Sequence, residues 1–271
     1  MSEHTAPEST LPYPPIHTDK KFVVLSDWDG TITTYDSNDY LTDHYGFGKP
    51  MRRQGNLDIL SGADTFRDGF RKMLNSVSEN GHTFEECKEI LKENIKLDPG
   101  FKEFYAWCKA QDIPVIIVSS GMAPLIRAVL SKLIGDDESA KIEIIANDVV
   151  LKPEGEWEIK FRHPSRRPCR VAWNLRGMPG FGHDKSQAII PYLQSAARPT
   201  LFFFGDGVSD ISAAKHADLL FVKTKEDGEN DLSVYCEREG IKHHLIKTFG
   251  EALPVVQDIV EGRKTIQDVL S

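Results

Sequence analysis

The sequence has few cysteines and no long apolar segment. Its 271 residues include four cysteines, Cys87, Cys108, Cys169 and Cys236, and none of them forms a CxxC pair. This usage argues against a disulfide framework or a zinc knuckle and is typical of a reduced cytosolic protein. No apolar run approaches the roughly 18 residues that a membrane-spanning helix requires, and the N-terminal stretch lacks the apolar centre of a secretory signal. We therefore expect a cytoplasmic protein without a membrane partner.

The sequence is also short of positive charge. Lys and Arg number 33 against 41 Asp and Glu, which gives a net charge of −8. A nucleic-acid-binding protein usually presents a basic surface, so this balance argues against such a partner. A few local cations could still hold a small anionic substrate. The length suits one large domain or a domain with an insertion, and the composition says nothing about the oligomeric state.

Short apolar segments alternate with helical patterns along much of the chain. We expect helices at residues 101–110, 184–193 and from about 249, and irregular structure at 163–182. Such alternation favours an α/β fold with a Rossmann-like, mainly parallel sheet that has helices on both faces. We expect buried strands at residues 22–25, 113–118, 142–145, 200–204 and 219–222, and a hairpin at 148–161.

Two stretches differ from this α/β pattern. Residues 1–20 are polar and rich in proline, which predicts a disordered N-terminal tail. Residues 37–99 carry apolar residues at helical spacing and contain no predicted strand. We interpret 37–99 as a small helical cap inserted after the first strand. The α/β core then consists of residues 21–36 and 100–271.

Three of the predicted strands run directly into polar segments that contain glycine. These segments are residues 27–31, 119–121 and 205–210. Ligands of parallel α/β sheets bind beyond the carboxyl ends of the strands, so the three segments should converge on one site. Each segment also has a purely structural interpretation. The first could be an Asp-Gly turn, the second a capped turn, and the third a helix start capped by Asp210.

The residue types in these segments suit phosphoryl chemistry. Asp27 and Asp29 are two residues apart, so one carboxylate can stay ionised against a metal while the other keeps a proton to donate. Asp206 and Asp210 supply further oxygen ligands of the kind that Mg²⁺ prefers. Lys185, at the start of a predicted helix, could neutralise both a phosphate and the aspartates, although a lone lysine is more often a solvated surface residue.

The serine segment adds hydrogen-bond donors. Ser119, Ser120 and Gly121 offer hydroxyl and backbone N–H groups at a predicted helix start, which is a ready site for phosphate oxygens.

Taken in order, DWDGT, an apolar strand ending in SSG, a helix-start lysine and GDGVSD resemble the four motifs of the haloacid dehalogenase-like phosphatases. The resemblance runs from about residue 22 to 222.

This resemblance implies a role for each motif residue. Asp27 matches the nucleophile that forms an aspartyl-phosphate, and Asp29 matches the general acid/base. A Mg²⁺ ion would be held by the carboxylates of Asp27 and Asp206 and by the backbone carbonyl of Asp29, with Asp210 supporting it. The phosphate-binding positions implied by the motifs and by their donors are Gly30, Thr31, Ser119, Ser120, Gly121 and Lys185.

The helical unit between the first two motifs resembles one subgroup of that family. That subgroup contains the phosphoserine phosphatases, the methionine-salvage enol-phosphate phosphatases and the phosphocholine phosphatases. Phosphoserine phosphatases typically carry Glu nine residues after the nucleophile, where this sequence has Asp36, and the strings TITTYDSND and SGADTFRDGFRKML are more similar to the other two groups. Asp36, Asp39, Arg67 and Arg71 are candidate specificity residues. The structural alternatives are a helix cap for Asp36 and a solvated face for the arginines.

We therefore expect a Mg²⁺-dependent phosphomonoesterase that hydrolyses a small phosphorylated metabolite through an aspartyl-phosphate. Two alternatives use the same scaffold: a phosphotransferase that passes the phosphoryl group to another alcohol, and a non-catalytic regulatory protein that binds a phosphorylated metabolite. A dehalogenase is a weaker alternative, because that reaction needs neither the second aspartate nor the metal-binding acidic pair.

Overall fold

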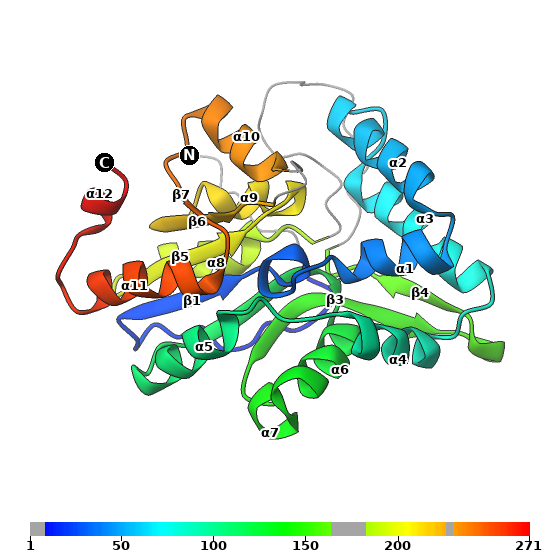
Figure 1. The fold of residues 1–271 in the computed structure, drawn as a ribbon, viewed down its shortest axis with the longest axis horizontal. Coiled ribbons are helices and arrows are strands. Elements are labelled where there is room, and N and C mark those ends of the chain that lie inside the picture. Colours follow the sequence, from blue (N-terminus) through cyan, green and yellow to red (C-terminus); the bar gives the residue numbers. More distant parts are fainter. Residues whose placement is uncertain (1–8, 164–182, 226–229) are drawn as a thin grey trace.

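A seven-stranded sheet lies at the centre of the computed structural model, which describes residues 9–163, 183–225 and 230–271 (Figure 1). The strand order is β4-β3-β2-β1-β5-β6-β7, and every neighbouring pair is parallel except the β3–β4 hairpin. The predicted α/β fold is confirmed. The strands are β1 (Phe22–Ser26), β2 (Val115–Met122), β3 (Glu143–Leu151), β4 (Trp157–Lys160), β5 (Thr200–Gly205), β6 (Leu219–Lys223) and β7 (His244–Ile246).

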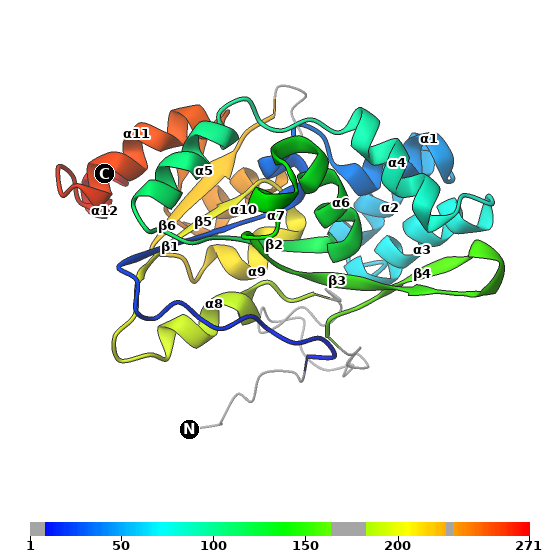
Figure 2. The same cartoon turned by 90° about the horizontal axis from the view of Figure 1, so that it is seen from below.

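Helices cover both faces of this sheet and extend beyond one end of it (Figures 1 and 2). None of the helices in the described ranges is long and apolar enough to cross a bilayer. The helices are α1 (Ser37–Tyr45), α2 (Lys49–Ser61), α3 (Phe66–Glu79), α4 (Phe84–Asn94), α5 (Phe101–Ala110), α6 (Ala123–Ile134), α7 (Asp136–Ser139), α8 (Ser186–Leu193), α9 (Ile211–Ala214), α10 (Asp231–Glu239), α11 (Phe249–Val260) and α12 (Ile266–Val269).

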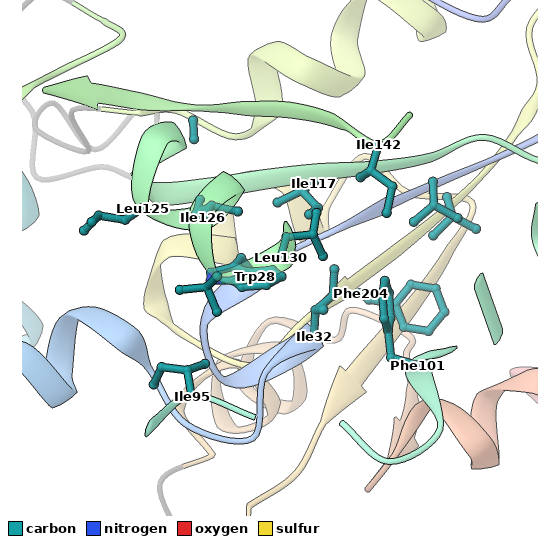
Figure 3. Packing of buried hydrophobic residues seen from close by; sticks show 14 of the residues in the cluster. Trp28, Ile32, Ile95, Phe101, Ile117, Leu125, Ile126, Leu130, Ile142 and Phe204 are labelled. Carbon is teal, nitrogen blue, oxygen red and sulfur yellow. The ribbon is translucent and has the colours of Figure 1, made fainter. Parts of the chain in front are cut away.

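Alternate residues of the central strands build two separate cores. Val24 of β1 points to the face covered by α5, α6 and α11, whereas Val23 and Leu25 point to the face covered by α8, α9 and α10. Figure 3 shows the first core, where Trp28 lies among side chains of α6 and Phe204 lies near Phe101 of α5. Burial on both faces explains why the strands read as continuous apolar runs in the sequence.

Helices α1 to α4 lie together at the end of the molecule next to the β3–β4 hairpin (Figure 1). Helix α3 packs against α1 and β4, and α4 packs against α6. The ring of Phe84 on α4 meets Trp157 on β4 edge to face. These helices fall within the stretch 37–99 that the sequence predicts as a cap, and the cap boundaries stay a prediction.

Several predicted elements differ from the structure. The expected strand at 142–145 and the first strand of the hairpin form one continuous strand, β3. Strand β2 runs through Ser119–Gly121 to Met122, so the serines lie in the strand, before α6, and not at a helix start. Helices α7, α10 and α12 and strand β7 were not predicted, and α2 was not resolved as a separate helix within the predicted helical stretch 37–99. Most of the expected irregular segment, 164–182, lies outside the described residues.

The N-terminal stretch also differs from the predicted disordered tail. Residues 1–8 lie outside the described part of the chain, but residues 9–20 contact the core. The backbone N–H of Thr10 donates to the carbonyl of Arg162 at 2.7 Å, and the Arg162 guanidinium donates to the carbonyls of Leu11 and Pro12 at 3.0 Å each. Composition predicted disorder because these partners lie about 150 positions away in the sequence.

Candidate active site

The three polar segments meet at the carboxyl edge of the sheet. Strand β1 lies between β2 and β5, and the chain builds the sheet outward in both directions from this point. Such a switch in strand order is where α/β sheets bind their ligands. A cavity of about 120 Å³ opens there, and Asp27, Asp29, Ser119 and Asp206 all line it. Its size suits a small molecule.

Asp27 lies at the base of the cavity beside a buried lysine. The ammonium of Lys185, which is fully buried, donates to Asp27 Oδ1 at 2.6 Å and to Asp210 Oδ1 at 2.7 Å. Burial alone would discharge this ammonium, but the charges of Asp210 and Asp27 outweigh burial and raise the pKa of Lys185 above its ordinary value. Lys185 is therefore a fixed positive charge and not the solvated lysine of the alternative interpretation.

Asp210 does not cap α9 with its side chain. Its Oδ2 accepts hydrogen bonds from the backbone N–H groups of Asp206 at 3.0 Å and Gly207 at 3.1 Å, so the side chain closes the loop after β5. This closure fixes Asp206, which is only 4% exposed. Asp206 Oδ1 in turn accepts from the hydroxyl of Thr31 at 2.8 Å, which joins the first and last motifs.

Gly30 lies in the tight turn between Asp27 and Thr31. Its φ is +75°, and a Cβ there would lie 2.5 Å from Asp206 Oδ2. Only glycine therefore allows this turn and the close approach of Asp206. Thr31 and Gly30 are buried beneath the cavity, and neither is among the residues that line it.

The acidic side chains at this edge fit a divalent cation. Carboxylate oxygens of Asp27, Asp206 and Asp210 lie within 4.8 Å of one another. Burial and the negative charge of Asp210 hold the pKa of Asp27 well above its ordinary value, while Lys185 opposes this rise. The ammonium groups of Lys185 and Lys225 still leave negative charge among these three carboxylates uncompensated, and oxygen donors in this number match the preference of Mg²⁺.

Asp29 is held by the first residues of α1. Its Oδ1 accepts from the backbone N–H of Ser37 at 2.7 Å and from the Ser37 hydroxyl at 2.5 Å, and its Oδ2 accepts from the side-chain amide of Asn38 at 2.7 Å. Burial and the charge of Asp36 raise the pKa of Asp29 to about 8, against the opposing effect of the Ser37 hydrogen bonds. Asp29 is therefore a fixed carboxyl group that can hold a proton near neutral pH.

The serine segment presents donors to the same cavity. Ser119, Ser120 and Gly121 all line it. The Ser120 hydroxyl is buried and has no hydrogen-bond partner among the described residues, which leaves it available for a ligand. From behind, the carbonyl of Ser119 accepts from His183 Nδ1 at 2.7 Å, and the carbonyl of Ser120 accepts from the Asn147 side chain at 2.7 Å. These bonds fix the backbone of the segment.

The outer part of the cavity has an apolar wall and a polar wall. Ile59, Phe66, Phe70 and Met73, from α2 and α3, form the apolar wall. The polar side chains of this outer region are Asp36, Asp39, Asn56, Lys225 and Asp231. Asp36 caps α1, as the structural alternative predicts, because its Oδ1 accepts from the N–H groups of Asn38 and Asp39. Asp36 therefore caps α1 and lines the cavity at the same time.

Arg67 and Arg71, predicted as specificity residues, do not line the cavity. The Arg67 guanidinium donates to the backbone carbonyl of His163 at 2.6 Å and lies over the ring of Phe161. Arg71 pairs with Asp68 at 3.1 Å on its own helix. Both arginines are therefore used in packing α3 or within it, and we propose no substrate role for them.

Sequence reasoning missed five polar residues of the site. Ser37 and Asn38 hold Asp29, while Asn56, Lys225 and Asp231 line the outer cavity. Lys225 offered a signal, because it follows the predicted strand at 219–222 and therefore lies at the same edge of the sheet as the other motifs. Asn56 offered none, since its helix was not resolved within the predicted helical stretch 37–99.

Comparisons with known proteins identify the family of this chain. A sequence model of the haloacid dehalogenase-like hydrolases matches residues 24–215. Pdp3-interacting factor 1 of Schizosaccharomyces pombe is 46% identical over 86% of this chain and 93% of its own length. Polyol phosphate phosphatase PYP1 of Saccharomyces cerevisiae is 39% identical over 92% of this chain and 98% of its own. A 2-hydroxy-3-keto-5-methylthiopentenyl-1-phosphate phosphatase of Bacillus pumilus is 25% identical over 85% and 88%.

The fold is also found among solved structures. A phosphoserine phosphatase, solved as an analogue of its phospho-aspartyl intermediate, matches with a TM-score of 0.56 and covers 90% of this chain and 98% of its own. Its identity is 16%, so it supports the fold alone. The chain belongs to the haloacid dehalogenase-like hydrolase family. Within that family it is a phosphatase, which agrees with the resemblance seen in its motifs.

Proposed function

We propose that the protein is a Mg²⁺-dependent phosphomonoesterase in which Asp27 is the nucleophile. The observation that carries this proposal is the contact of Lys185 with both Asp27 and Asp210 beneath a cavity lined by Asp29 and Ser119. The buried Lys185 ammonium fixes the position of the Asp27 carboxylate and offsets part of its negative charge. Both effects favour attack of this carboxylate on an anionic phosphate.

In the first half-reaction, an Asp27 oxygen attacks phosphorus and the bond from phosphorus to the leaving oxygen breaks. Asp29, whose pKa lies near 8, gives its proton to the leaving oxygen, so that a neutral alcohol departs. Ser37 and Asn38 keep the Asp29 carboxyl group in place during this transfer. The Ser119 and Ser120 hydroxyls and the Lys185 ammonium stabilise the charge on the phosphoryl oxygens.

In the second half-reaction, water attacks the phosphorus of the aspartyl-phosphate. Asp29, now a carboxylate, accepts a proton from this water, and the bond between phosphorus and the Asp27 oxygen breaks. The products are inorganic phosphate and the original Asp27 carboxylate, so atoms and protons balance over the cycle. An acceptor alcohol in place of water would make the protein a phosphotransferase, and no feature of the cavity favours that alternative.

The residues that would hold Mg²⁺ are Asp27 and Asp206, with the Asp29 backbone carbonyl, and Asp210 supports them through the loop after β5. When bound, the ion supplies positive charge that neutralises the phosphate oxygens. Three carboxylates, Asp27, Asp206 and Asp210, face two ammonium groups, those of Lys185 and Lys225, and this excess of negative charge supports the assignment.

The substrate that we propose is a phosphorylated small molecule with hydroxyl groups. The outer cavity offers carboxylate oxygens, the Asn56 amide and one ammonium, a mixture of acceptors and donors that suits hydroxyls. The name of the yeast relative, a polyol phosphate phosphatase, supports this class. Arg67 and Arg71 lie outside the cavity, so these two arginines offer nothing to the carboxylate of phosphoserine.

A phosphate-release assay tests the proposed function. Purified protein would be incubated with glycerol 3-phosphate, sorbitol 6-phosphate, phosphoserine, phosphocholine, a methionine-salvage enol phosphate and an aryl phosphate, with Mg²⁺ or with EDTA. We expect turnover that requires Mg²⁺, is highest on the polyol phosphates, and is absent from folded Asp27→Asn. Turnover that persists in Asp27→Asn would refute the nucleophile, and a preference for phosphoserine would refute the substrate class.

A further inference from the structure

Lys225 is an ammonium placed at the border between the catalytic carboxylates and the outer cavity. It follows β6, lines the cavity, and its Nζ lies 2.6 Å from Asp206 Oδ2. A Cβ built on Gly30 would lie 3.0 Å from the same Nζ, so the ammonium lies directly over the first motif. Among the described residues that line the cavity, Lys225 is the one cation, because Lys185 lies beneath the wall.

The charge of Lys225 acts on the outer carboxylates as well. Asp36 and Asp39 line the same cavity as Lys225. An ammonium group in this wall therefore faces the outer carboxylates as well as Asp206.

A second cation acts on that wall from behind. Arg52 of α2 is almost fully buried, and it pairs with Asp39 at 2.7 Å and with Asp43 at 2.7 Å. Asp39 is thus already compensated by a residue that does not line the cavity. Among the described residues, no cation forms an ion pair with Asp36: its Oδ1 caps α1, and its Oδ2 accepts no hydrogen bond. Lys225, which pairs with Asp206, is the described cation that lines the same cavity as Asp36.

Without these cations, the outer cavity would suit an amine. Three carboxylates, Asp36, Asp39 and Asp231, and the rings of Phe66 and Phe70 would surround the leaving group. Carboxylates together with aromatic faces attract primary and quaternary ammonium groups. A fixed ammonium in the same wall repels them and still donates hydrogen bonds to hydroxyl oxygens.

We propose that Lys225 is a specificity-determining residue, which directs this cavity to neutral hydroxylated leaving groups and away from cationic ones. This inference rests on the proposed phosphomonoesterase function. Lys225 repels a leaving group that carries an ammonium, while Asp36 Oδ2 accepts and Lys225 donates hydrogen bonds to hydroxyls of a polyol. Specificity then follows from a repulsive element as well as from an attractive one.

The test compares two phosphomonoesters with leaving groups of similar size, glycerol 3-phosphate and phosphoethanolamine. The measured quantity is the ratio of their kcat/KM values, in which effects on the shared phosphoryl chemistry cancel. We expect Lys225→Met to lower this ratio about tenfold or more, because a like-charge contact is lost. Lys225→Arg should restore most of the ratio. Lys160→Met, an exposed lysine of β4 outside the cavity lining, is the matched control and should leave it unchanged.

An aryl phosphate separates failure of this inference from failure of the proposed function. If the wild type turns it over and Asp27→Asn does not, but Lys225→Met keeps the wild-type ratio, the role of Lys225 is refuted. If the wild type turns over none of the phosphomonoesters, the proposed function itself fails.

Should Lys225→Met be inactive, calorimetric titration of the two substrates answers the same question in an Asp27→Asn background. We expect Lys225→Met to improve binding of phosphoethanolamine relative to glycerol 3-phosphate. An unchanged ratio of the dissociation constants would overturn the inference.

Discussion

Replacing Lys185 by methionine removes the charge on which the arrangement of Asp27 and Asp210 depends. The ammonium is fully buried and contacts the two carboxylates at 2.6 and 2.7 Å. Methionine keeps much of the side-chain volume, so the loss is mainly electrostatic. Two buried carboxylates then face each other without a counter-charge. Breaking a buried ion pair in this way costs about 3–5 kcal/mol of unfolding free energy.

This cost converts into measurable quantities. At about 2–4 °C per kcal/mol for a domain of this size, the Tm of the metal-free Lys185→Met variant should fall by roughly 10 °C. Mg²⁺ should recover more stability in this variant than in the wild type, because a bound cation takes over part of the missing charge. Turnover with Mg²⁺ should fall about 10²- to 10³-fold, the loss that follows removal of one preorganised hydrogen-bond donor.

Thermal unfolding in EDTA and in Mg²⁺, followed by circular dichroism, measures the stability, and phosphate release measures the turnover. Adding Asp210→Asn to Lys185→Met should return much of the lost stability without returning turnover, since one uncompensated carboxylate is removed. The exposed control Lys160→Met should change the unfolding free energy by less than about 0.5 kcal/mol. A Lys185→Met variant with the Tm and the turnover of the wild type would refute the reasoning.

Three further predictions concern the acid, the serine segment and the core. Asp29→Asn should slow turnover of alkyl phosphates far more than formation of the intermediate from an aryl phosphate, because an aryl leaving group needs no proton. Pre-steady-state measurements in which both rates fall equally would contradict this. Asn147→Ala should raise the inhibition constant of inorganic phosphate and cost about 1–3 kcal/mol of stability, because the carbonyl of Ser120 loses its donor; an unchanged inhibition constant would refute its supporting role. Phe204→Ala should lower the unfolding free energy by about 3–5 kcal/mol in a denaturant titration, since its ring is fully buried between Phe221 and Phe249; a loss below 1 kcal/mol would contradict that packing.

The central sheet was predictable because its strands are buried on both faces. Phe22–Ser26 and Thr200–Gly205 read as continuous apolar runs that end in polar residues, and this pattern places the motifs at one edge without any knowledge of contacts. The catalytic candidates were predictable for the same reason. Asp27, Asp29 and Asp206 follow such runs directly.

The remaining features depend on contacts between distant parts of the chain. Residues 9–13 read as a disordered tail, because nothing in their composition shows that the Arg162 guanidinium binds their carbonyls. Arg67 was a candidate specificity residue with a solvated helix face as the alternative, but its guanidinium donates to the carbonyl of His163, 96 positions away. Lys225 reads as one lysine among many, and its contact with Asp206 gives it a place in the site. The sequence shows the charge and type of each of these residues, but it does not show which distant residue each of them contacts.

The most direct test of the account is to look for the phosphoryl group on Asp27. Folded Asp29→Asn would be mixed with an aryl phosphate and Mg²⁺, quenched in acid, and analysed by intact-protein and peptide mass spectrometry. Because this variant forms the aspartyl-phosphate but hydrolyses it slowly, we predict one added phosphoryl group, mapped to Asp27 and absent from Asp27→Asn/Asp29→Asn. A phosphoryl group on another residue, or phosphate release with no trapped adduct at any quench time, would contradict the account.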